Sequence, residues 1–141
     1  MTGSAAGYSG TPLARKLGVR DGETAWRKGM PETVAEEIAA SGTVQRLVAV
    51  PEPGLAFAHV FETRRSALED DLAALRILLA PTGMVWVSWP KKSAKVETDI
   101  TEDVVRAAAL PLGFVDVKVC AVDAVWSGLK LVVRKELRAA R

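Results

Sequence analysis

Two adjacent lysines, Lys91 and Lys92, directly follow an apolar segment, and a helix start follows at Thr98 and Asp99. Lysine side chains attract anions, and the first turn of a helix adds free amide groups and the positive end of its dipole. This pattern predicts a site for a small anionic ligand, such as a phosphate or a carboxylate. The alternative is that acidic side chains already neutralise this helix start and pair with the lysines. Those acidic residues are Asp99, Glu102 and Asp103.

Aromatic and hydroxyl side chains supply further binding candidates. Trp89 and Trp126 lie near the ends of predicted strands, where an indole ring can stack on a ligand, although a core or subunit-contact role is the alternative. Tyr8 and Ser9 precede a short helix in a glycine-rich segment. These two residues could fold over a ligand, or they could belong to a chain end that caps the helix.

Recognised catalytic patterns are missing from the sequence. The one histidine, His59, lies in an apolar segment with no Cys, His or acid at metal-ligand spacing, so we expect a packed side chain. Cys120 has no histidine nearby in sequence, which predicts a buried and unreactive thiol. Neither a nucleophile elbow nor a phosphate-binding loop occurs. We therefore predict no catalytic residue and no metal, and the cofactor stays unknown.

Composition narrows the class of protein. The chain has 141 residues, of which 49% are apolar, and 19 basic and 17 acidic side chains give a net charge of +2. A charge this balanced predicts no nucleic-acid partner. A single cysteine excludes an internal disulfide, and no apolar run approaches the ~20 residues of a membrane span or forms a secretory signal. We therefore predict a cytoplasmic protein with no membrane partner.

Alternating apolar patterns predict an α/β fold. We expect helices over 12–17, 31–41, 66–80 and 99–110, and strands over 23–28, 43–50, 55–61, 84–89, 115–121 and 129–134. Expected helix caps are Thr11, then Ser66 with Glu69 or alternatively Thr63, then Asp99 with Glu102. The expected buried stripes are Leu68, Leu72, Leu75 and Leu79 in the third helix, and Ile100, Val104, Ala107 and Ala108 in the fourth.

This order of elements implies an open, mostly parallel sheet of about six strands, with helices on both faces and a C-terminal antiparallel hairpin. Residues 1–10 are expected to form a flexible arm, and residues 11–141 one domain. Ligands of such sheets bind beyond the carboxyl ends of the strands, which is where Trp89, Lys91 and Lys92 fall.

Two resemblances follow from these segments. The turn Leu79-Ala-Pro-Thr-Gly83, its flanking helix and strand, and the terminal pair of strands resemble the C-terminal half of class I S-adenosylmethionine-dependent methyltransferases. Segments 6–18, 88–92, 98–106 and 118–129 more specifically resemble a family of small uncharacterised bacterial proteins of unassigned function with this Rossmann-like fold. The resemblance implies the fold and carries over no activity.

The loop that should hold a cofactor departs from the methyltransferase pattern. These enzymes use a glycine-rich loop after their first strand and an acidic residue after the second. Here the corresponding loop, 26–32, has one glycine, and the nearest acidic residue, Glu52, lies between two prolines. We therefore expect a non-catalytic ligand-binding or regulatory module with a degenerate cofactor loop. The alternatives are a small methyltransferase, and a subunit of a larger assembly or homodimer that uses Trp126 and the segment at Tyr8 as contacts.

Overall fold

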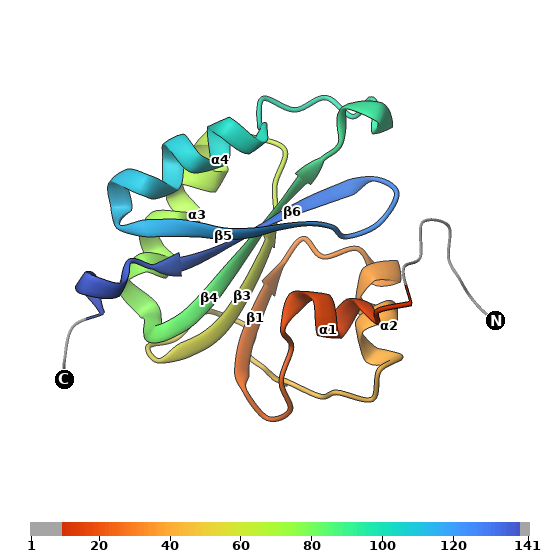
Figure 1. Cartoon of the computed structure of the whole chain (residues 1–141), viewed down its shortest axis with the longest axis horizontal. Helices are drawn as coiled ribbons and strands as arrows, with labels where there is room; N and C mark the ends of the chain where they lie inside the picture. Colours follow the sequence, from red (N-terminus) through yellow and green to blue (C-terminus); the bar gives the residue numbers. More distant parts are fainter. Residues whose placement is uncertain (1–9, 139–141) are drawn as a thin grey trace.

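The computed structural model describes residues 10–138, which build one six-stranded sheet with helices on both faces (Figure 1). The strands are β1 (Thr24–Lys28), β2 (Arg46–Leu47), β3 (Leu55–Phe61), β4 (Leu79–Pro90), β5 (Phe114–Ala121) and β6 (Trp126–Val133). Their order across the sheet is β2-β1-β3-β4-β6-β5. The first four strands run parallel, and β6 pairs antiparallel with both β4 and β5. The predicted open, mostly parallel sheet with a C-terminal antiparallel hairpin is confirmed.

Two separate apolar cores lie on the two faces of this sheet. The α-helices of residues 10–138 are α1 (Leu13–Leu17), α2 (Glu32–Ala39), α3 (Arg65–Leu78) and α4 (Glu102–Ala109). α1 and α2 pack with Phe57 and Trp86, whereas α3 and α4 pack with Ala58 and Val87. Because successive residues of a strand face opposite sides, neighbours such as Phe57 and Ala58 belong to different cores.

The apolar stripe of α3 follows the prediction over most of its length. Leu68, Leu72 and Leu75 are at most 1% exposed. Leu79 is also buried, but it begins β4 and pairs with Leu55 of β3. The turn expected at Pro81 to Gly83 therefore lies inside a longer strand. A Cβ atom on Gly83 would lie 2.9 Å from the carbonyl oxygen of Leu55, so only glycine permits this close pairing.

All of the predicted side-chain caps are wrong in detail. α1 begins after Pro12 and uses no cap from Thr11. α3 begins after Arg64, and the amide of Arg65 instead donates to Asp99 Oδ1 at 2.6 Å. Asp99 therefore serves α3, which is distant in sequence, and not the helix that follows it. The cap of α4 is Thr101, whose Oγ1 accepts from the amide of Val104 at 3.2 Å.

The burial of α4 shifts with this cap. Val105 and Ala109 are the fully buried residues of the helix, Val104 and Ala108 are half-buried, and Ala107 is exposed. Ile100 is buried as expected, but it precedes the helix and so does not set the direction of its apolar face.

Strand boundaries also differ from those expected. β2 covers only Arg46–Leu47 in place of 43–50, and both of its residues are exposed at the sheet edge. β6 begins at Trp126, because its antiparallel pairing with β4 continues to Pro90 and shortens the predicted loop over 123–128. β5 is the other edge strand, and Val117 and Val119 remain 54% and 50% exposed.

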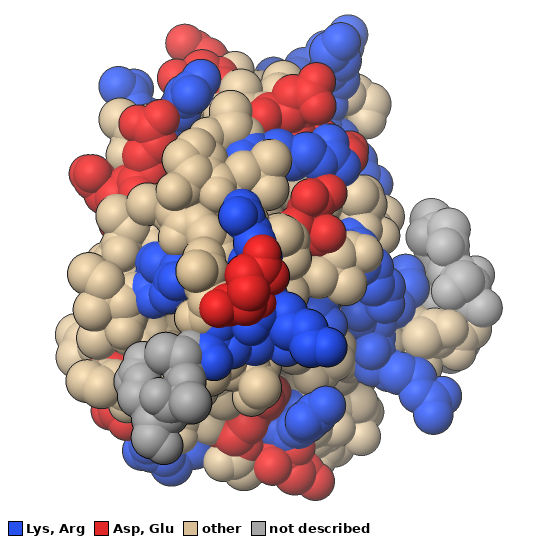
Figure 2. Space-filling view, turned by 60° about the vertical axis from the view of Figure 1, so that its left-hand side comes forward, with Lys and Arg blue, Asp and Glu red and all other residues tan. Residues whose placement is uncertain are grey.

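Charged side chains of both signs cover the surface. In Figure 2, blue and red groups often lie next to one another, whereas blue groups with few red ones follow the right-hand margin of the view. Within residues 10–138, no helix is long and apolar enough to cross a membrane.

Candidate functional site

The parallel strands β1, β3 and β4 bring their carboxyl ends to one edge of the sheet (Figure 1). Lys28 ends β1, Glu62 directly follows β3, and Lys91 directly follows β4. Ligands of open α/β sheets bind in the crevice outside such ends. We therefore treat this carboxyl edge as the candidate site.

A lysine and two carboxyl groups form the most concentrated charge cluster at the carboxyl edge. Lys28 Nζ lies 2.7 Å from Glu62 Oε2 and 2.7 Å from Asp71 Oδ1, where Asp71 comes from α3. The side chain of Lys28 is 41% exposed, whereas those of Glu62 and Asp71 are 11% and 9% exposed. The cationic end of the cluster therefore meets solvent, and the two acids lie beneath it.

The carboxyl group of Asp71 holds a proton more tightly than an ordinary aspartate. Burial, together with a hydrogen bond to Glu62, raises the pKa of Asp71 to about 7, although Lys28 opposes the shift. Burial lowers the pKa of Lys28, but its hydrogen bonds to Asp71 and Glu62 outweigh burial and raise it overall. With both acids ionised, Asp71 Oδ2 has no hydrogen-bond partner among the described residues. A proton on Asp71 lets it donate to Glu62, so the pair can store a proton near neutral pH.

An open hollow of about 410 Å³ begins at Thr63, the residue after Glu62, and its lining includes two predicted site residues. Its described lining consists of Thr63, Arg64, Glu97, Thr98 and Asp99. Thr98 Oγ1 donates to the carbonyl of Thr63 at 2.7 Å, and the amide of Asp99 donates to the same carbonyl at 3.2 Å. These bonds hold the loop before α4 against the loop after β3.

The predicted lysines lie apart from this hollow. Lys91 is half-buried and its amide donates to the carbonyl of Val125 at 2.7 Å, while the exposed Lys92 begins the 3-10 helix η2 (Lys92–Ala94). Neither belongs to the described lining. The structure therefore brings Thr98 and Asp99 together in one hollow, and it places the two lysines outside it.

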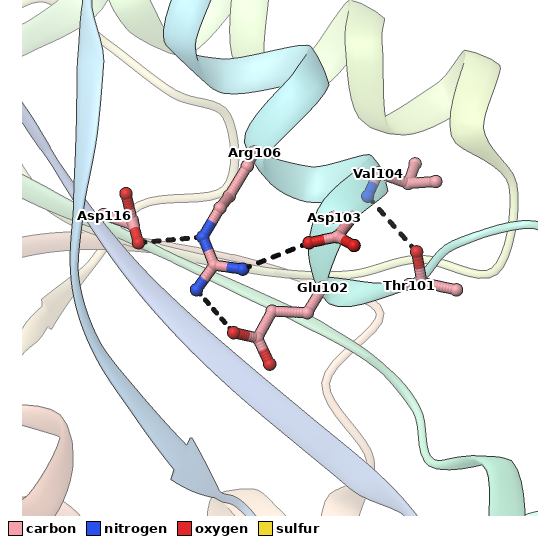
Figure 3. Close-up of polar contacts among 6 residues, drawn as sticks. All are labelled: Thr101, Glu102, Asp103, Val104, Arg106 and Asp116. Atoms are coloured by element: carbon pink, nitrogen blue, oxygen red, sulfur yellow. Dashed lines mark hydrogen bonds and ion pairs between the residues drawn. The ribbon is translucent and has the colours of Figure 1, made fainter.

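The start of α4 is neutralised by its own side chains, as Figure 3 shows. Arg106 binds Glu102 and Asp103 on the same helix and reaches Asp116 of β5 at 2.9 Å. The hydrogen bond to Asp116, more than that to Glu102, raises the pKa of Arg106, and the same bond lowers the pKa of Asp116. The acids of this helix start thus pair with an arginine and not, as the alternative held, with Lys91 or Lys92.

The predicted aromatic candidates occupy opposite faces of the sheet. Trp89 is 7% exposed and belongs to the core under α3 and α4. Trp126 is half-buried on the other face, where its ring meets that of Phe61 edge-on at 5.1 Å. Tyr8 and Ser9 lie outside the described residues. Trp126 therefore remains beside the carboxyl edge, whereas Trp89 serves packing.

His59 forms a buried polar pair that the sequence does not reveal. Its Nε2 lies 2.8 Å from Ser88 Oγ, both residues are 0% exposed, and its ring stacks on Phe61 at 4.3 Å. Burial, and to a lesser degree the charge of Arg27, lowers the pKa of His59 to about 3, which keeps the ring neutral at ordinary pH. This environment agrees with the predicted packed histidine. Residues 10–138 contain no group of three side chains suited to hold a metal ion.

The loop after β1 keeps one feature of a cofactor loop and lacks another. Gly29 has φ +70°, and a Cβ there would lie 3.0 Å from the carbonyl oxygen of Phe61, so the backbone approaches β3 closely. Glu52 pairs with Arg46 at 3.0 Å, and the same guanidinium nitrogen binds Thr24 at 3.0 Å. Because Thr24 begins β1, Glu52 lies at the opposite end of this strand from the candidate site.

Sequence reasoning missed Lys28, Glu62 and Asp71 as a group. Lys28 ends one predicted strand and Glu62 follows another, so their positions at one edge could have been inferred from parallel pairing. The contribution of Asp71 depends on where α3 lies along the sheet relative to the end of β1, which no local pattern specifies.

No protein-family model matches this sequence, and no curated protein is detectably similar to it. Similar folds do occur among solved structures. A SAM-dependent methyltransferase from Aquifex aeolicus matches with a TM-score of 0.58 at 15% identity, over 86% of this chain and 88% of that one. A putative type 11 methyltransferase from Sulfolobus solfataricus matches with a TM-score of 0.57 at 10% identity, over 86% and 89% of the two chains. A ribosomal protein L11 methylase from Lactobacillus delbrueckii subsp. bulgaricus matches with a TM-score of 0.54 at 15% identity, over 86% and 75%.

Identities this low show the fold alone. The predicted resemblance to the small bacterial family stays a prediction. The chain has the Rossmann-like fold of class I S-adenosylmethionine-dependent methyltransferases.

Proposed function

We propose that this protein binds S-adenosylmethionine at the carboxyl edge of its sheet and transfers the methyl group to a small acceptor. The observation that carries the proposal is the strand order β2-β1-β3-β4-β6-β5, with β6 reversed, in a fold shared with proteins named as methyltransferases. This reading replaces the non-catalytic module as the leading hypothesis, because these structural neighbours favour the enzyme.

The residues at the carboxyl edge fit such a cofactor in part. Gly29 lets the loop after β1 turn tightly against β3 at φ +70°, since a Cβ there would lie 3.0 Å from the carbonyl oxygen of Phe61. No acidic residue follows β2 directly, because Glu52 is held near Thr24. The ribose hydroxyls would therefore depend on backbone groups or on the side chains that line the hollow at Thr63 and Asp99.

S-adenosylmethionine supplies an electrophilic methyl group on a sulfonium, which a nucleophilic atom of the acceptor attacks as the carbon–sulfur bond breaks. The chain's own contribution would be to take up the proton that the acceptor loses. Glu62 and Asp71 suit this role because burial and their mutual hydrogen bond raise the pKa of Asp71 to about 7. Lys28 holds both carboxyl groups in position at 2.7 Å.

The test is calorimetry with S-adenosylmethionine and S-adenosylhomocysteine, followed by turnover of methyl-labelled cofactor. We expect binding that Gly29→Ala weakens at least about tenfold, because a side chain there clashes with the backbone of Phe61 and displaces the loop after β1. Gly54→Ala is the matched control, since Gly54 has a similar φ of +84° but no atom within 4 Å of a built Cβ. Absence of binding to either compound at millimolar concentration would exclude the proposal.

The second candidate is a non-catalytic binding module, which the placement of Glu52 favours. The carboxylate of Glu52 pairs with Arg46 at the far end of β1. It therefore does not supply the acidic group that usually binds the ribose hydroxyls of the cofactor. This reading predicts binding of a ligand at the carboxyl edge without release of labelled product. The homodimer and the cytoplasmic location stay predictions.

A further inference from the structure

Five basic side chains gather beside α1, on the face of the β5–β6 hairpin that α1 borders. We call them the basic strip. They come from α1 and the loop after it, from the residue after β4 and from both strands of the hairpin, and are Lys16, Arg20, Lys91, Lys118 and Lys130.

Backbone geometry places these residues together. Lys118 and Lys130 are register partners in β5 and β6, and Lys118 Nζ donates to the carbonyl of Lys16 at 3.0 Å. Lys91 is tied to the start of β6 through its amide, which donates to the carbonyl of Val125. The blue groups along the right-hand margin of Figure 2 agree with a basic surface on this side.

The charges of the basic strip act on one another. Burial, followed by the charges of Lys118 and Arg20, lowers the pKa of Lys130. Burial raises the pKa of the half-buried Cys120, and Lys16, Lys118 and Lys91 oppose this shift. Two separate groups therefore report the same concentration of positive charge.

Within residues 10–138, no carboxylate pairs with any of the five, although four other basic residues do form ion pairs. Several acids near the strip in sequence have other partners. Asp116 pairs with Arg106, Asp21 accepts from the amide of Val44, and Asp123 accepts from the amides of Val125 and Trp126. One carboxylate, that of Glu23, accepts from the backbone amide of Arg20 at the end of the strip. The net charge of +2 thus conceals a local excess of basic side chains at the other four residues.

We propose that the basic strip binds a single-stranded nucleic acid. A row of phosphates matches cations that come from several elements, whereas a single small anion would engage only one or two of them. The amide of Lys91 binds the carbonyl of Val125, and the next residue is the half-buried Trp126. A base would stack on the face of such an indole ring. This inference stands apart from methyl transfer, and it revises the expectation drawn from net charge alone.

The experiment is fluorescence anisotropy of a labelled oligouridylate of about 12 nucleotides. We expect binding that weakens steeply with salt, and Lys118→Glu and Lys130→Glu each to weaken it about tenfold. Lys135→Glu is the control, because it makes the same charge change at an exposed residue beyond the other end of β6. Thermal unfolding checks each variant, and Lys118→Gln and Lys130→Gln give a second pair that removes charge without reversing it.

Equal losses in the control and the basic-strip variants, or no binding of the wild type at low salt, would overturn the proposal. A polyglutamate peptide that binds as tightly as the oligonucleotide would also overturn it and would indicate an acidic protein partner. If the oligonucleotide binds but S-adenosylmethionine does not, the basic-strip proposal stands and the methyl-transfer proposal fails. The two proposals can therefore be tested separately.

Discussion

At the scale of single residues, the raised pKa of Asp71 is the feature with the clearest consequence. Asp71 has a pKa of about 7 in the folded protein, above its ordinary value of about 3.9. Between these values the folded protein holds a proton that the unfolded chain has already released. The free energy of unfolding therefore decreases, through this group, as pH rises from about 4 to 7, and it is level above that range.

Asp71→Asn should remove this contribution. We expect the difference in unfolding free energy between wild type and variant to change with pH by no more than about 1.4 kcal/mol per unit below pH 7, and to be constant above it. Urea unfolding at half-unit steps from pH 5 to 8 measures this difference. Asp70→Asn is the control, because Asp70 is exposed next to it in α3. Parallel curves for Asp71→Asn and wild type would contradict the assignment.

His59 acts in the opposite direction and has to be separated from Asp71. Its pKa of about 3 lies below the ordinary value of about 6.5, because burial disfavours the charged ring. Through His59, the free energy of unfolding decreases as pH falls from about 6.5 towards 3. The wild-type curve is thus a sum of two opposed contributions, and only the comparison with Asp71→Asn isolates the carboxyl pair.

At the scale of elements, the helix ends show how neighbouring loops stabilise one another. Asp99 lies just before α4 but caps α3 through Arg65, and Thr101 caps α4 through Val104. Asp99→Ala and Thr101→Ala should each lower the free energy of unfolding by about 1 kcal/mol, since a side-chain hydrogen bond to a first-turn amide contributes about that much.

The helix whose first turn loses protection from hydrogen exchange distinguishes the two caps. We expect Asp99→Ala to increase amide hydrogen exchange in the first turn of α3, and Thr101→Ala to increase it in the first turn of α4. Hydrogen exchange resolved by residue makes the comparison, and each variant serves as the control for the other. If Asp99→Ala instead affects the first turn of α4, then the cap across the two loops is wrong.

Periodicity in the sequence predicts the elements better than their ends. The leucines of α3 face the core because their spacing of three and four residues is a property of the helix itself. The capping box at Asp99 and Glu102 is wrong because a carboxylate can accept from any amide within reach, and the carbonyl of Thr63 holds this segment beside α3. The candidate site shows the same limit of sequence-based prediction. The strand order predicts the carboxyl edge as its location, but the position of Asp71 there depends on tertiary packing.

At the scale of the whole molecule, the sheet separates two cores that differ in composition and in the surfaces they lie beside. The core under α3 and α4 is large and apolar, and it includes Trp89. The core under α1 and α2 contains the polar pair His59 and Ser88 and lies beside the basic strip. The proposed methyl transfer uses the edge between the faces, and the proposed nucleic-acid surface extends along only one of them.

The attachment of α1 decides whether this second face keeps its shape. Trp86 Nε1, in the middle of β4, donates to the carbonyl of Leu17 at 2.8 Å, and both residues are 0% exposed. Trp86→Phe keeps an aromatic ring but leaves that buried carbonyl without this donor. We expect a loss of about 1–3 kcal/mol in the free energy of unfolding, as for a buried acceptor deprived of its partner.

The effect of Trp86→Phe should be confined to one side of the sheet. Amides of α1 should exchange faster, because its last turn loses its bond to the sheet, whereas amides of α3 should keep their protection relative to global unfolding. Oligouridylate binding should weaken as well, since Lys16 and its contact with Lys118 move with α1. A variant that loosens α1 yet binds the oligonucleotide as the wild type does would show that the strip does not need Lys16 in place.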